Sequence, residues 1–193
     1  MPSRLLQATL HLACAMPALI LLWRTWQGTL GAEPVETLLH TTGDWALRLL
    51  LLTLVVSPLR RWSGWSGVMR WRRPLGLWAF AYASAHALIY IGLDQFFDWG
   101  ELWRDLVKRP YITLGMLTWL LLLPLALTST RAAQRRLGRA WGRLHRLIYP
   151  AALLAPIHFL LLVKADRLES LLYLAAAVTL LFWRREKIFP IRE

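Results

Sequence analysis

The sequence predicts an all-α protein: an integral membrane bundle of six transmembrane helices, with both termini cytoplasmic. Hydrophobic residues make up 57% of the 193-residue chain and charged residues only 18%. The mean hydropathy is +0.42, and this composition argues against an ordinary soluble domain. The apolar residues form continuous runs, which excludes the alternating pattern of a membrane β-barrel. The twelve tryptophans are typical of a chain with many water–lipid boundaries.

Each apolar run is close to the length of about 20 residues that a helix needs to cross about 30 Å of hydrocarbon. The first run holds the single cysteine, Cys14, expected to be a small buried residue, and we interpret this run as a retained span rather than a cleaved signal peptide. The third and fourth runs contain no charged residue, and the sixth is the shortest. No internal repeat or linker is apparent, so we expect one domain over residues 1–193. The six runs are approximately Leu5–Trp23, Thr41–Leu59, Pro74–Leu93, Tyr111–Thr128, Leu147–Val163 and Leu168–Trp183.

Positive charge predicts the orientation of the bundle, because cytoplasmic loops are enriched in Lys and Arg. Two loops and the C-terminal tail are basic, whereas the outer loop "DQFFDWGELWRDLVKR" has four acids against three bases. The net charge of +12 does not indicate nucleic-acid binding, since the basic clusters flank apolar runs. The clusters are Arg60, Arg61, Arg70, Arg72 and Arg73; Arg131, Arg135, Arg136, Arg139 and Arg143; and Arg184, Arg185, Lys187 and Arg192.

The common enzyme motifs are missing, and histidines carry the chemistry that remains. The sequence has no GxGxxG or P-loop, and "GWSG" is too short for a nucleophile elbow. His86 and His158 lie inside the third and fifth runs, where an ionisable residue indicates function. Neutral imidazole is a common axial ligand of haem iron. Small residues around His86 leave room for a macrocycle or, alternatively, allow close helix packing.

Depth in the membrane pairs His86 with His158. Both runs are expected to lead from the cytoplasm outward, and the two histidines lie about 18 Å and about 16 Å along them. An inner level, about 20 Å away, would hold His145 and Arg73, which lie 13 residues before His158 and His86. On a straight helix 13 residues turn by about 220°, so His145 and His158 would not share a face. Pro150 and Pro156 are expected to alter that angle.

The chain resembles the ferric-reductase-like transmembrane family and, within it, the haem-binding membrane subunits of periplasmic methionine sulfoxide reductase systems. The resemblance covers approximately residues 10–164. It is carried by "LGAEPVETLLHTTGDWALRLLLLTLVVSPL", "RRPLGLWAFAYASAHALIY", "RPYITLGMLTWLLLLPLALTST" and "LGRAWGRLHRLIYPAALLAPIHFLLLVK".

This resemblance implies a bacterial inner-membrane, multi-pass subunit with b-type haem, with His86, His145 and His158 on the haem-associated positions. Electrons would come from a cytoplasmic flavin reductase or the quinone pool, and FMN is associated with the family. The acceptor would be a periplasmic molybdopterin-containing methionine sulfoxide reductase catalytic subunit. Two-haem relatives carry a histidine pair on each of the two ligand helices. In this chain the third run has only His86, and Arg73 stands where the second histidine of that pair would be. The chain thus holds one haem or two, and His145 either holds the second or lines a quinone or flavin site.

Several other residues have two interpretations each. Arg48 either snorkels or pairs with a haem propionate, and Arg72, Trp78 and Tyr149 are candidate propionate, flavin or quinone contacts. His11 and His40 are expected to have packing or interfacial roles. Arg131, Arg135, Arg139 and Arg143 recur every four residues, which on one helix makes a basic stripe for anionic lipid, an acidic flavoprotein or the FMN phosphate.

Two other functions compete with haem-based electron delivery to a methionine sulfoxide reductase. The same scaffold could serve a ferric or cytochrome b-type reductase with another acceptor. A cofactor-free transporter or assembly subunit would use the histidines as a proton relay, although the spans contain few acids.

Overall fold

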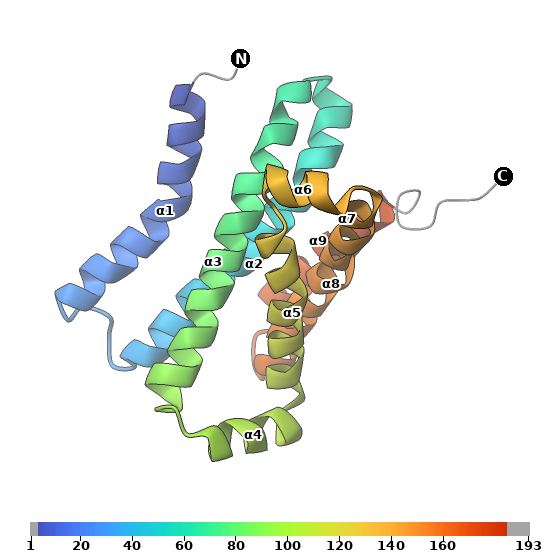
Figure 1. Ribbon diagram of the computed structural model, residues 1–193. Helices are drawn as coiled ribbons and strands as arrows, with labels where there is room; N and C mark the ends of the chain where they lie inside the picture. Colours follow the sequence, from blue (N-terminus) through green and yellow to red (C-terminus); the bar gives the residue numbers. More distant parts are fainter. Residues whose placement is uncertain (1–3, 185–193) are drawn as a thin grey trace. The chain divides into compact units, whose positions relative to one another are not determined.

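Every element that the computed structural model defines in the part it describes, residues 4–184, is helical (Figure 1). This confirms the all-α prediction. The basic tail positions Arg185, Lys187 and Arg192 lie outside the described residues. In chain order the elements are α1 (Arg4–Trp26), α2 (Pro34–Ser63), the 3₁₀ helix η1 (Ser66–Trp71), α3 (Arg72–Ile89), the π-helix η2 (Tyr90–Asp94), α4 (Trp99–Lys108), α5 (Pro110–Leu127), α6 (Arg131–Leu137), α7 (Arg139–Leu144), the 3₁₀ helix η3 (His145–Leu147), α8 (Ile148–Leu162) and α9 (Leu168–Phe182).

Five helical segments in the described range are long and apolar enough to cross a membrane. They are Leu5–Trp26, Pro34–Ser63, Ser66–Asp94, Pro110–Leu127 and Arg139–Leu162. The sixth predicted span corresponds to α9, which has 15 residues and therefore a length of about 22 Å. The count of six spans and the cytoplasmic termini stay predictions.

The chain forms two compact units, Met1–Leu102 and Trp103–Glu193. In the first unit α2 and α3 pack along each other as an antiparallel hairpin, with α1 beside them (Figure 1). In the second unit α5 and α8 form another antiparallel hairpin, and α9 packs on α8. Ala151 and Ala152 of α8 are fully buried, as expected where small residues let membrane helices approach closely.

Helix α2 begins earlier than the apolar run predicted. Pro34 occupies its first turn, where a missing N–H costs nothing, and Glu36 favours the positive end of the helix dipole. His40 therefore lies within α2, 3.5 Å from the Glu36 carboxylate. The helix ends at Gly64, whose φ of 66° is left-handed and whose amide donates to the Arg60 carbonyl.

Tyr82 of α3 joins α1 to the first hairpin. Its buried hydroxyl donates to the Cys14 carbonyl at 2.8 Å and accepts from the Ala18 amide at 3.0 Å. In a regular helix these two backbone groups would bond each other. The contact lies beside Pro17, which disturbs the same turn of α1. Cys14 is buried as predicted, with 4% of its surface exposed.

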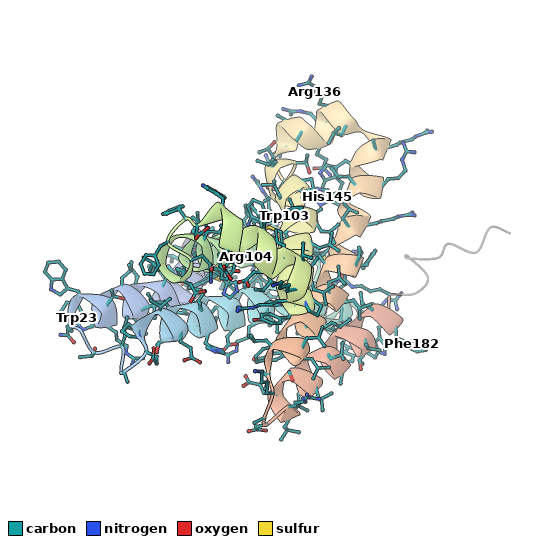
Figure 2. All side chains as sticks on the ribbon, turned by 90° about the horizontal axis from the view of Figure 1, so that it is seen from below. Trp23, Trp103, Arg104, Arg136, His145 and Phe182 are labelled. Atoms are coloured by element: carbon teal, nitrogen blue, oxygen red, sulfur yellow. The ribbon has the colours of Figure 1, made fainter. Side chains whose placement is uncertain are left out.

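Large apolar side chains cover the outside of the helices. Figure 2 shows Trp23 at the end of α1 and Phe182 at the end of α9, both directed away from the ribbon, and each is 61% exposed. Trp26, Trp62, Trp99 and Trp103 are also strongly exposed and lie near helix ends or in the connecting helix α4. This distribution fits a lipid-facing surface with aromatic side chains at the interfaces.

The basic connection between α5 and α8 contains two short helices rather than one. Thr130 caps α6 by accepting a hydrogen bond from the Ala133 amide. Gly138 separates α6 from α7, since its φ of 50° and ψ of −122° are not helical. The proposed stripe is therefore divided, with Arg131 and Arg135 on α6 and Arg139 and Arg143 on α7. Arg136 points away from the ribbon at the end of α6 (Figure 2).

Candidate functional site

His86 lies in the last turn of α3 and contacts the backbone of α2. Its Nδ1 is 2.9 Å from the Leu39 carbonyl oxygen. A carbonyl only accepts, so Nδ1 carries the proton in this contact. The lone pair of the neutral imidazole is then on Nε2, the nitrogen farther from the main chain.

Gly43 provides the space for this contact. It lies one helical turn after Leu39, and a Cβ on it would be 3.2 Å from both Cε1 and Nδ1 of His86. The ring of His86 thus rests directly on the backbone of α2. Any larger residue at position 43 would press against it.

His158 repeats the arrangement in the second unit. It lies near the end of α8, and its Nδ1 is 2.6 Å from the Tyr111 carbonyl oxygen of α5. Gly115 lies one turn after Tyr111, and a Cβ there would be 2.9 Å from Cε1 of His158. His158 is therefore also protonated on Nδ1, with its lone pair on Nε2.

The two arrangements have the same spacing along the chain. The residue whose carbonyl accepts the hydrogen bond lies 47 positions before the histidine in each case. The second set lies 72 positions after the first: Tyr111 corresponds to Leu39, Gly115 to Gly43 and His158 to His86. The first and second hairpins thus share this arrangement of carbonyl, glycine and histidine. Of its three positions only the glycine and the histidine are identical in the two hairpins, so the correspondence is not apparent in the sequence.

His145 has a different environment. In η3, its Nε2 is 3.1 Å from the Thr128 hydroxyl, and its ring stacks on Trp141 at 3.9 Å between centroids. The Trp141 indole also donates to the Thr128 carbonyl. Because the Thr128 hydroxyl donates to the Pro124 carbonyl at 2.6 Å, it accepts from His145. His145 thus carries its proton on Nε2, unlike His86 and His158.

Both His145 and His158 contact α5, one at each end of that helix. His145 lies in a 3₁₀ segment, which turns further per residue than an α-helix, so the angle between His145 and His158 differs from that expected on a straight α-helix. Arg73, the predicted inner partner of His145, is an exposed residue in the first turn of α3, next to the half-buried Arg72. The pairing of residues across the two units stays a prediction.

Two of the remaining candidates, Arg48 and Trp78, have partners in their own unit. Arg48 is 3.6 Å from the Asp44 carboxylate and its guanidinium lies 5.4 Å from the Trp45 ring centre. The Trp78 indole donates to Nδ1 of His11 on α1 at 3.0 Å, which gives His11 the packing role expected of it. Tyr149 is half-buried in the first turn of α8.

Comparison with known proteins identifies the family. Residues 42–156 match the model of the ferric reductase like transmembrane component. The chain belongs to this family. Together with the five helices of spanning length, this makes it a multi-pass membrane protein.

Closer relatives match nearly the whole chain. One from Caulobacter vibrioides is 47% identical over 188 residues, covering 95% of this chain and 90% of its own length. One from Xanthomonas campestris pv. campestris (strain 8004) is 50% identical over 193 residues, covering 97% of this chain and 88% of its own length. Each is named protein-methionine-sulfoxide reductase heme-binding subunit MsrQ. No solved structure matches the chain.

Proposed function

We propose that this protein is a membrane electron-transfer subunit that binds b-type haem, with His86 and His158 as the axial ligands. The observation that carries the proposal is the matched environment of the two imidazoles. Each donates from Nδ1 to a backbone carbonyl and so holds its lone pair on Nε2, the state in which a histidine binds iron. The relatives named as heme-binding subunits support the same assignment.

The residues present fit this cofactor. Each half-buried ring lies on a glycine of the facing helix, where no side chain occupies the space next to the ring. A haem held by two imidazoles supplies one-electron transfer without an open coordination position. The protein holds each ring through a backbone carbonyl, which keeps the ring and its protonation state fixed.

We propose that electrons pass to a periplasmic molybdopterin-containing methionine sulfoxide reductase catalytic subunit. The names of the relatives support this acceptor. The donor would be a cytoplasmic flavin reductase or the quinone pool, with FMN or quinone near the basic α6–α7 region. The acceptor would meet the outer segment around α4, which carries exposed Trp99 and Trp103.

Absorption spectroscopy of the detergent-purified protein tests haem binding. We expect a low-spin b-type spectrum on reduction with dithionite. His86→Ala and His158→Ala should each abolish most of this absorbance, while His40→Ala should keep it, since His40 is exposed and lies beside Glu36. Unchanged haem content in either ligand variant would contradict the assignment.

The inner level is a separate part of the proposal. Arg73 and His145 occupy equivalent positions 72 residues apart, as His86 and His158 do. The bond from His145 to Thr128 uses Nε2, so an inner haem would need this bond to open or would take Nδ1. The number of haems bound per chain in the His145→Ala variant tests whether His145 is a ligand. A fall from two haems to one assigns the inner haem to His145, and an unchanged number removes His145 from the ligand set.

A second candidate function keeps the haem and changes the acceptor. The family description, a ferric reductase like component, favours ferric iron as that acceptor. Membranes containing the protein should reduce a purified periplasmic methionine sulfoxide reductase in a His86-dependent manner. Reduction of ferric chelates without reduction of that partner would favour the second function.

A further inference from the structure

We propose that Gly43 and Gly115 are positioning residues for the two axial histidines. Each glycine lets an imidazole lie against the backbone of the facing helix, within reach of the carbonyl one turn earlier. This inference rests on the proposed function, because it assigns the glycines a role in haem ligation. Leu39, Gly43 and His86 form one such cradle, and Tyr111, Gly115 and His158 form the other.

The distances show that a side chain at either position would crowd the imidazole. A Cβ on Gly115 would be 2.9 Å from Cε1 and 3.0 Å from Nδ1 of His158, closer than real Cβ atoms come. A Cβ on Gly43 would be 3.2 Å from the same two atoms of His86, which is tight but less severe. The effect of alanine should therefore be larger at position 115 than at position 43.

The clash falls on the atom that makes the hydrogen bond. In both cradles Nδ1 is among the atoms nearest to the missing Cβ, and the same Nδ1 donates to the carbonyl. An added methyl group moves the ring away from its acceptor, which frees the ring to rotate and to take the other tautomer. Partners that orient a metal-bound histidine in this way typically change metal affinity by about 10–100-fold.

The carbonyl acceptor is part of the main chain of the facing helix. In a regular helix the carbonyl of Leu39 accepts from the amide of Gly43, and that of Tyr111 from the amide of Gly115. Acceptor and glycine thus belong to one hydrogen-bonded turn of the facing helix. The histidine is held by main chain that no side-chain rotation can displace.

Four alanine substitutions test the proposal in full-length protein. Gly43→Ala and Gly115→Ala are compared with Gly76→Ala in the first unit and Gly142→Ala in the second. A Cβ on Gly76 would be 3.7 Å from Thr53, an ordinary contact, and one on Gly142 would have no neighbour within 4 Å. Haem affinity is measured by titrating haem-free protein, and the tautomers of His86 and His158 are read from their ring ¹⁵N chemical shifts.

We expect Gly115→Ala to weaken haem binding by about tenfold or more, Gly43→Ala to weaken it less, and both controls to bind as the unmodified protein does. The haem-free unmodified protein should show both histidines protonated on Nδ1, and each glycine variant should lose that signal at its own histidine. Equal haem affinity and unchanged tautomers in all four variants would overturn the proposal. So would Nε2-protonated His86 or His158 in the unmodified protein, a measurement that does not require any variant to fold.

The two proposals fail in different ways. If the unmodified protein binds no haem while both histidines show Nδ1–H, the proposed function fails and the cradle geometry stands. If the protein binds haem and the glycine variants behave like the controls, the proposed function stands and the positioning role is wrong.

Discussion

At the scale of single residues, the backbone of a neighbouring helix decides the chemistry of each histidine. His86 and His158 meet carbonyl oxygens through Nδ1, and His145 meets a hydroxyl through Nε2. Because a neutral imidazole has one donor and one acceptor nitrogen, these contacts separate the three rings into two classes. The sequence places a histidine at each position but does not distinguish the classes.

Tyr82 gives a prediction at this scale. Tyr82→Phe removes the hydroxyl that bonds the Cys14 carbonyl and the Ala18 amide, so we expect the haem-free protein to lose about 1 kcal/mol of stability. Unfolding in detergent by denaturant titration measures this loss. Tyr149→Phe is the control, because no hydrogen bond of the Tyr149 hydroxyl is found in the described part of the chain. Equal stability of the two variants would contradict a role for Tyr82 in holding α1.

At the scale of elements, the functional unit is the antiparallel hairpin. The end of α3 lies against the beginning of α2, and the end of α8 lies against the beginning of α5, so each histidine meets the first turns of its partner helix. In both hairpins the helix that supplies the carbonyl and the glycine starts with proline, Pro34 or Pro110. The hairpins differ in their connections, which are η1 in the first and α6, α7 and η3 in the second.

Thr128 fastens the second connection to α5. Thr128→Val removes the hydroxyl that His145 and the Pro124 carbonyl contact, while the shape of the side chain is nearly kept. We expect faster hydrogen exchange of residues 139–147 and unchanged haem at the outer site. Thr118→Val is the matched control on the same helix, since its hydroxyl bonds the Leu114 carbonyl of α5 itself. Equal exchange of residues 139–147 in the two variants would show that Thr128 does not hold this connection.

At the scale of the whole molecule, the proposed ligands belong to different compact units, one histidine in each. A cofactor that binds only the folded protein stabilises it, by about 2.7 kcal/mol at a concentration of 100 times Kd. We therefore expect haem to raise the melting temperature of the unmodified protein. His86→Ala and His158→Ala should each remove most of the increase, because one imidazole of the pair is then missing. An undiminished increase in either variant would place the haem elsewhere.

Orientation in the membrane is a second whole-molecule prediction. The positive-inside rule predicts that α6 and α7 face the cytoplasm and α4 faces outward. In a Cys14→Ala background, Arg136→Cys should react with a membrane-impermeant thiol reagent only after the cytoplasmic side is opened. Trp99→Cys should react from outside, since Trp99 is 70% exposed. The opposite labelling pattern would reverse the predicted topology.

The sequence by itself determined the class of protein and the residues at the centre of the candidate site. Apolar run length and loop charge predict membrane helices, and the bounds of α5, α8 and α9 agree with the predicted runs within one residue. His86 and His158 were found as ionisable residues inside those runs. These features follow from hydrophobicity and local periodicity, which depend only on residues near in the chain.

Tertiary structure alone decided what each histidine contacts. The carbonyls of Leu39 and Tyr111 lie 47 positions before the histidines that they contact. Every residue has a backbone carbonyl, so the sequence does not show which one accepts the hydrogen bond. Gly43 and Gly115 are ordinary in composition and acquire meaning only when another helix brings an imidazole within van der Waals distance. Likewise, Trp78 of α3 donates to His11 of α1, a partner that a linear pattern does not specify. Packing between helices distant in sequence sets these contacts, and local propensities do not encode it.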